Sequence, residues 1–205
     1  MLFDSLVLIS LLVMITLLRS LVNIFPSLAA CIVRVKESFN IDASIKLQRD
    51  RNILSLASGL PFCLIVFSFG LYSPEFMTGL GPEAALGLTI GIFLMYTMLR
   101  TLLRTVTRPR KAQATYATAA TAAYTFFIIL TLALFCTGGV MTIFNADSGS
   151  IKNAMIWVSS LIYIIFLIRK VQIFASSYNY FTVFLYLCAL EIIPTGVLIT
   201  SAIIF

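Results

Sequence analysis

Long stretches of apolar residues are the feature that most constrains how this chain can fold. A transmembrane helix needs about 20 predominantly apolar residues in succession. Such stretches cover approximately residues 2–25, 53–72, 84–103, 117–144, 151–168 and 181–204. We therefore predict an all-α, polytopic membrane protein. Residues 1–205 would form a single transmembrane domain, a bundle of about six helices joined by short loops.

The overall composition excludes a soluble globular domain. Of the 205 residues, 60% are hydrophobic and 11% are charged, whereas soluble domains have roughly 45–50% apolar and about 25% charged residues. The chain has no histidine, which excludes His–metal sites and catalytic pairs that use histidine. No phosphate-binding loop or nucleophile elbow is present. We expect no enzymatic activity, no metal and no cofactor.

The basic residues are concentrated in three segments, residues 34–51, 100–111 and 169–170. In a six-span arrangement, the only basic residue in the connections on the opposite side is Lys152. The positive-inside rule then predicts that the basic segments are cytoplasmic and that both termini are on the non-cytoplasmic side. Several of these residues would form a cytoplasmic basic face that attracts anionic lipid headgroups, with no nucleic acid expected. This predicted face consists of Arg49, Arg51, Arg100, Arg104, Arg108, Arg110 and Lys111.

Glu191 is the acidic residue placed deepest within a predicted span. A bare carboxylate near the middle of a bilayer is unfavourable, so it must be protonated, paired or hydrogen-bonded. Together with Pro194 and Tyr186 of the same run it forms a candidate intramembrane polar site. One interpretation is a proton or cation relay or a contact with a basic partner; the other is a protonated side chain bonded to a neighbouring helix. Arg19 is a candidate partner if the first span extends to Phe25, and otherwise lies at the membrane interface.

Gly87 and Gly91 form a GxxxG motif within the third span. Small residues at this spacing allow two helix backbones to approach closely in lipid. The motif predicts helix packing, either within this chain or against a partner protein or a second copy.

The run Phe184-Leu-Tyr-Leu-Cys-Ala-Leu-Glu-Ile-Ile-Pro194 resembles the C-terminal signature of an uncharacterised family of multi-pass inner-membrane proteins of Bacteroidota. The phrase Gln48-Arg-Asp-Arg-Asn52 is similar to an Arg-rich segment that members carry before an early span. The resemblance implies a bacterial inner (plasma) membrane location and a role for Glu191 and Pro194. It implies no particular activity.

Two classes of function remain open from the sequence. The first is a non-enzymatic accessory subunit or assembly factor of a membrane complex, which the small size and the small-residue helix faces favour. The second is a small proton- or ion-linked transporter or channel that uses Glu191. A water-filled cavity beside Glu191 would favour the second class, and a tightly packed, dry surround would count against it.

Overall fold

The computed structural model describes residues 2–77, 79–107 and 113–204, which form helices without any strand. Two helices, α1 and α2, begin the chain and are followed by the short α3 and by α4, which continues into α5. A short 3₁₀ turn, η1, precedes three long helices, α6 to α8, and the chain ends with α9, a π-helical turn η2 and α10. Their bounds are α1 Leu2–Thr16, α2 Leu18–Val33, α3 Val35–Ala43, α4 Ile45–Ala57, α5 Gly59–Ser68, η1 Glu75–Met77, α6 Pro82–Val106, α7 Gln113–Ile143, α8 Ser148–Ala175, α9 Tyr180–Leu187, η2 Cys188–Ile192 and α10 Ile193–Ile204.

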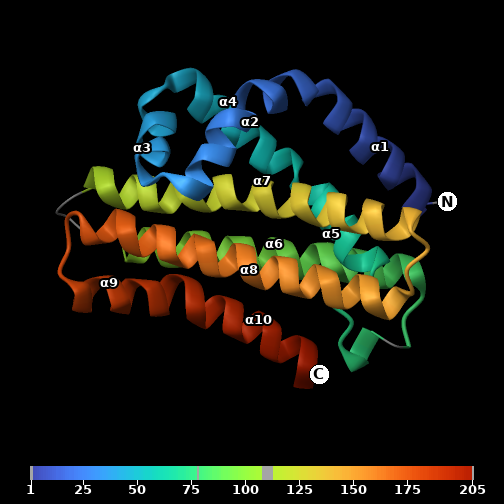
Figure 1. Cartoon of the computed structure of the whole chain (residues 1–205). Helices are drawn as coiled ribbons and strands as arrows, with labels where there is room; N and C mark the ends of the chain where they lie inside the picture. Colours follow the sequence, from blue (N-terminus) through green and yellow to red (C-terminus); the bar gives the residue numbers. More distant parts are fainter. Residues whose placement is uncertain (1, 78, 108–112, 205) are drawn as a thin grey trace.

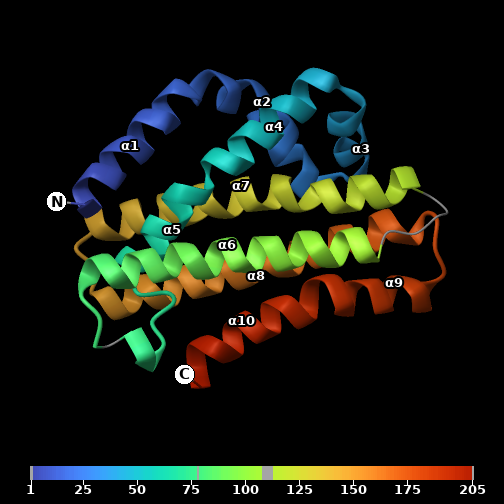
Figure 2. The same cartoon turned by 180° about the vertical axis from the view of Figure 1, so that it is seen from behind.

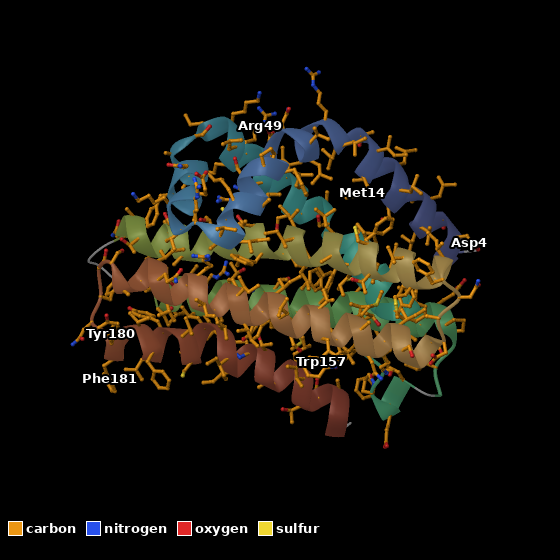
Figure 3. All side chains as sticks on the ribbon, viewed as in Figure 1. Asp4, Met14, Arg49, Trp157, Tyr180 and Phe181 are labelled. Carbon is orange, nitrogen blue, oxygen red and sulfur yellow. The ribbon has the colours of Figure 1, made fainter. Side chains whose placement is uncertain are left out.

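The predicted multi-pass helical architecture is confirmed. Within the described residues, five helical segments are long and apolar enough to cross a membrane: Ile45–Ser68, Pro82–Val106, Gln113–Ile143, Ser148–Ala175 and Tyr180–Ala202. Large apolar side chains point outward from these helices, as Trp157 and Phe181 do in Figure 3. Trp157 is 76% exposed and Phe181 is 70% exposed. Apolar exposure on this scale would be a liability in water and suits a surface that faces lipid.

The first predicted span is not one straight helix. The chain bends by 69° between Phe3–Thr16 and Leu18–Val33. Helices α1 and α2 therefore provide a sixth crossing only if the bent pair is taken as a single span. The break lies at Leu17, whereas Pro26, the predicted interruption, lies inside α2. Ile24 and Leu28 of α2 are buried in a cluster with residues of α4 and α7. We attribute the bend to this packing, which draws α2 onto the bundle.

The helices alternate in direction, so the connections collect at two ends of the bundle (Figure 1). Helix α1 begins and α10 ends at the same end, which the reverse view confirms (Figure 2). The opposite end contains α3, the start of α4, the end of α6 and the end of α8 (Figure 1). Most of the basic residues belong to these segments. The fold therefore separates a basic end from an end that contains both termini.

Several helices extend farther toward the basic end than the sequence predicts. The predicted span 84–103 corresponds to α6, which reaches Val106, and the predicted span 151–168 corresponds to α8, which reaches Ala175. The predicted span 53–72 corresponds to α4 and α5, which begin at Ile45. One reason is that Arg51, Arg100 and Lys170 pair with carboxylates of neighbouring helices, so these charges do not end the helices. Predicted boundaries of the remaining spans, 117–144 and 181–204, lie within a few residues of α7 and of α9–α10.

Helices α7 and α8 form the most extensive helix pair. Their connection ends at Asp147, the N-cap of α8, whose side chain accepts a hydrogen bond of 3.0 Å from the Ser150 backbone N–H. Hydrogen bonds from the Ser150 side chain and backbone hold the pKa of Asp147 below its usual value. Near the same end, Gly138 of α7 lies against Met155 and Phe69. The end that contains the termini is thus held by apolar packing and a helix cap.

Candidate functional site

Glu191 is buried inside the bundle and is paired with two cations from other helices. Its side chain is 1% exposed. One carboxylate oxygen accepts from the Arg100 guanidinium of α6, and the other accepts from the Lys170 ammonium of α8. The Lys170 side chain is 2% exposed. The predicted need of Glu191 for a partner is therefore met by an intramolecular ion cluster.

The charge in this cluster is not balanced. Arg104, one helical turn after Arg100, interacts electrostatically with both Arg100 and Glu191. The ring of Phe166 lies beside Arg100 and Lys170, with its centroid 5.5 Å and 5.1 Å from the two charged groups. Two cations thus bind the carboxylate and a third, Arg104, interacts with it electrostatically, so these described residues have two positive charges in excess. We call Arg100, Arg104, Lys170 and Glu191 the charged cluster.

A π-helical turn carries Glu191 within the last span. The backbone N–H of Ile193 donates to the carbonyl of Cys188, five residues earlier, so η2 is wider than an α-helix. Pro194, which is buried, has no N–H to offer the preceding turn. The Tyr163 hydroxyl donates to the Glu191 backbone carbonyl at 3.1 Å and satisfies one of the disturbed backbone groups. Isolated π-helical turns occur frequently at functional sites.

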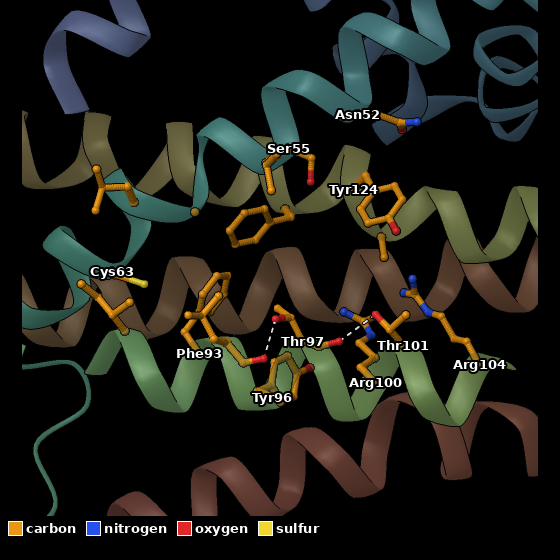
Figure 4. Close-up of a pocket in the computed structure, with 17 residues that line it drawn as sticks. Asn52, Ser55, Cys63, Phe93, Tyr96, Thr97, Arg100, Thr101, Arg104 and Tyr124 are labelled. Atoms are coloured by element: carbon orange, nitrogen blue, oxygen red, sulfur yellow. Dashed lines mark hydrogen bonds between the residues drawn. The ribbon is translucent and has the colours of Figure 1, made fainter. Parts of the chain in front are cut away.

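A groove of about 610 Å³ runs beside the charged cluster. Four helices, α4 to α7, line it. The lining residues of α6 recur every three or four positions, so one face of that helix is involved. The α6 lining residues are Ile90, Phe93, Leu94, Tyr96, Thr97, Arg100, Thr101 and Arg104. The other walls come from α4–α5, including Ser55 and Cys63, and from α7, including Tyr124. Figure 4 shows Arg100 and Arg104 toward one end of the groove, and Cys63 and Phe93 toward the other.

A second, smaller cavity of about 200 Å³ lies between α6, α7, α8 and α10. It shares Arg100, Tyr96 and Phe93 with the groove, so Arg100 stands between the two spaces. Thr195 also lines the smaller cavity, and its hydroxyl lies 3.1 Å from the Tyr96 hydroxyl. Open space therefore borders the charged cluster at Arg100 and Arg104, whereas Glu191 and Lys170 line neither cavity and are closely packed.

Two buried donors of this site have no acceptor among the described residues. Within the described part of the chain, the Nε atoms of Arg100 and Arg104 are buried without a hydrogen-bond partner. A buried donor left unpaired is unfavourable by about 1–3 kcal/mol, more when the group is charged. Both atoms belong to residues that line the groove, so an acceptor bound there would satisfy them once the guanidinium groups turned toward it. Unpaired donors and excess positive charge both indicate an anionic ligand.

A second buried ion pair lies near the basic end, between α4 and α3. Arg51 of α4 is 1% exposed and donates to Asp42 at 2.6 Å. The Thr121 hydroxyl of α7 lies 3.0 Å from the other Asp42 carboxylate oxygen and donates to it. One cation meets one carboxylate here, and each has a further polar neighbour. This pair connects α3 and α4 to the long helices.

The predicted basic face is divided by the structure into different environments. Arg49 is exposed, as Figure 3 shows, but Arg51 is buried in its pair with Asp42. Arg100 and Arg104 lie in the groove, so the prediction that they belong to a connecting segment is wrong. The reason is that Arg100 has a partner inside the bundle in the Glu191 carboxylate, and Arg104 lies over the Tyr124 ring of α7. The other three residues of the predicted face, Arg108, Arg110 and Lys111, lie outside the described residues.

The remaining predicted residues lie apart from the cluster. Tyr186 packs with other aromatic rings and stacks on Phe174, with centroids 6.0 Å apart. Arg19 is exposed, and the two cations on Glu191 come from α6 and α8 instead. Gly87 and Gly91 lie on an exposed face of α6, and no described atom lies within 4 Å of a Cβ added to either. The motif therefore makes no close packing with the described part of this chain.

Sequence reasoning missed Lys170 and the pairing of Arg100. One signal was available for Arg100: polar residues recur at positions 96–104 with helical spacing, at Tyr96, Thr97, Arg100 and Arg104. That spacing marks one polar helix face and suggests that Arg100 and Arg104 lie on the same side of one helix. For Lys170 we find no comparable signal, since it follows Arg169 at the end of an apolar run.

No family model, curated protein or solved structure matches this chain. The resemblance to the Bacteroidota inner-membrane family therefore stays a prediction.

Proposed function

We propose that this chain is a small membrane transport protein that binds an anionic ligand at the charged cluster. The carrying observation is the excess of charge: Arg100, Arg104 and Lys170 face the single carboxylate of Glu191 beside open space. An anion in the groove would neutralise part of this excess and accept from the unpaired Nε atoms. Glu191 then acts as an internal substitute for the ligand, holding Arg100 while the site is empty.

An exchange of partners would make the cluster responsive to its ligand. Arg100 lies at the junction of the groove and the smaller cavity, so movement of its guanidinium from Glu191 to a bound anion alters the wall between the two spaces. A ligand changes a conformational equilibrium only through different contacts in the two states, and this exchange provides such a difference. The proposal requires no catalytic group and no cofactor.

Arg104→Gln tests the proposal because Arg104 supplies excess charge while Glu191 keeps Arg100 and Lys170. The purified protein would be heated in nonionic detergent with sodium phosphate or with sodium chloride at equal ionic strength. We expect phosphate to raise the Tm of the wild-type protein, as a ligand that binds only the folded state does. The Tm increase should be mostly lost in Arg104→Gln and kept in Arg49→Gln, which removes an exposed arginine. An equal response to phosphate and chloride would refute the proposal.

The proposal also assigns an orientation and a location. The basic end is cytoplasmic, both termini are on the opposite side, and the membrane is a bacterial inner membrane. Support comes from the concentration of basic residues at one end of the bundle and from the resemblance of the Phe184–Pro194 run. Accessibility of cysteines introduced near Arg49 and near Asp147 to a membrane-impermeant reagent would test the orientation in intact cells.

A second candidate function is that of an accessory subunit or assembly factor. One observation favours it: the GxxxG face of α6 is open, with no described atom within 4 Å of a Cβ at Gly87 or Gly91. A partner helix or a second copy could pack there. The mass of the complex purified in mild detergent would decide: a partner or second copy should be lost in Gly91→Leu and retained in Gly196→Leu, where a Cβ is equally unobstructed.

A further inference from the structure

We infer that the ligand of the groove is an anionic lipid, which enters sideways from the bilayer with its phosphate at Arg100 and Arg104. This inference rests on the proposed function and specifies the class of ligand. A lipid suits the groove because the groove combines a cationic end with a long apolar wall on membrane-spanning helices.

The position of the cations along α6 suits a lipid headgroup. A helix of 25 residues is about 37 Å long at 1.5 Å per residue, and the hydrocarbon core is about 30 Å thick. Arg100 lies six residues before Val106, the end of α6, which corresponds to about 9 Å. An untilted α6 centred in the bilayer therefore places Arg100 within about 5 Å of the hydrocarbon boundary. Lipid phosphates lie just beyond that boundary, within reach of a long arginine side chain.

The rest of the groove suits an acyl chain. From Arg104 to Ile90, the α6 wall extends over 14 residues, or about 21 Å. This exceeds the ~15 Å that one leaflet contributes to the hydrocarbon core. The wall away from the arginines is apolar, with Phe93 and Leu94 on α6 and Leu60 and Cys63 on α5. A small free anion would leave this apolar length empty, whereas a lipid fills both parts.

The groove is also open to the surroundings of the bundle rather than enclosed. Two of its wall residues, Leu56 of α4 and Leu94 of α6, are 84% and 59% exposed and form opposite rims. Both are apolar and lie on membrane-spanning helices, so the opening between them faces lipid. A ligand dissolved in the bilayer can enter between these rims without crossing water.

The structure provides a matched pair of leucines with which to test the inference. Leu94 lines the groove about 9 Å along α6 from Arg100, on the side of the predicted acyl chain. Leu102 lies on the same helix and does not line the groove. Leu94 is 59% exposed and Leu102 is 58% exposed. Leu94→Trp should fill the apolar part of the groove, while Leu102→Trp adds the same ring outside it.

The experiment is native mass spectrometry of the purified chain in nonionic detergent, with phosphatidylglycerol and phosphatidylcholine of identical acyl chains at equal concentration. We expect the wild-type chain to retain phosphatidylglycerol with at least a tenfold preference. Leu94→Trp should reduce phosphatidylglycerol binding at least tenfold, and Leu102→Trp should bind as the wild type does. Unchanged phosphatidylglycerol binding in Leu94→Trp would overturn the inference.

The phosphate-dependent Tm increase separates this inference from the proposed function. If Leu94→Trp keeps that increase but loses phosphatidylglycerol, the anion site and the lipid groove are both supported. If the wild type responds to phosphate but shows no lipid preference, the lipid inference fails while the anion site stands. If phosphate has no effect in the wild type and in Leu94→Trp alike, the proposed function itself fails.

Discussion

The two buried ion clusters in the described part of the chain differ in their balance of charge. Arg51 meets one carboxylate, Asp42, which also accepts from Thr121. Glu191 alone faces Arg100, Lys170 and Arg104, and two Nε atoms there have no acceptor among the described residues. A balanced pair is complete without a ligand and can serve structure alone. An unbalanced cluster beside a groove has positive charge that none of its own carboxylates neutralises, and this charge is available to a ligand.

The largest expected effect is that of Glu191→Gln. Removing the only carboxylate leaves three cations without a counter-charge, and breaking a buried pair in this way typically destabilises by about 3–5 kcal/mol. The free energy of unfolding, measured by denaturant titration in mixed micelles, should fall by this amount. The double variant Glu191→Gln with Lys170→Met has the wild-type net charge and lacks the more buried cation. Its free energy of unfolding should therefore fall by less than that of Glu191→Gln alone. A double variant as unstable as Glu191→Gln would contradict the charge argument.

Arg51→Gln should have a smaller effect on stability and should contrast with Arg104→Gln. It leaves Asp42 unpaired, but that side chain is 16% exposed and keeps Thr121, so we expect a loss of about 2–3 kcal/mol. The phosphate-dependent Tm increase should be unaffected by Arg51→Gln. Arg104→Gln should show the reverse, with little loss of stability and little response to phosphate. If both variants lost the phosphate response, the distinction between the two clusters would be wrong.

The smallest effect should come from a region that contains neither cluster. A Cβ at Gly138 would lie 2.6 Å from Met155 Cε and 3.2 Å from the Phe69 ring, and such overpacking costs about 1–3 kcal/mol. Alanine gains about 0.5–1 kcal/mol over glycine within a helix, so Gly138→Ala should show a modest net loss. Gly139→Ala, which meets no atom within 4 Å, should be slightly more stable than the wild type. Neither variant should change the phosphate-dependent Tm increase. A changed increase would show that the end of the bundle that contains the termini takes part in binding.

Much of the fold could be predicted from the sequence because membrane helices are specified locally. Each long helix contains an apolar run that favours burial in lipid, and in lipid the helix satisfies its own backbone groups. The requirement that Glu191 have a partner also followed from its position in such a run. Helix ends were predicted less well: α6 continues to Val106 and α8 to Ala175, beyond the predicted ends at residues 103 and 168. Arg100 and Lys170 do not end their helices because Glu191 of the last span offers both a counter-charge.

The sequence by itself thus determined the helical class, the membrane-spanning segments and the need to stabilise one buried carboxylate. Only the tertiary structure decided which cations meet Glu191, since Arg100 and Lys170 are 91 and 21 residues away along the chain. It also decided that Arg51 and Arg104, similar in the sequence, differ in role, and that the Gly87–Gly91 face stays open within the described chain. The physical reason is that insertion of a helix depends on its own composition. Pairing of charges and the shape of a groove depend on how separate helices pack.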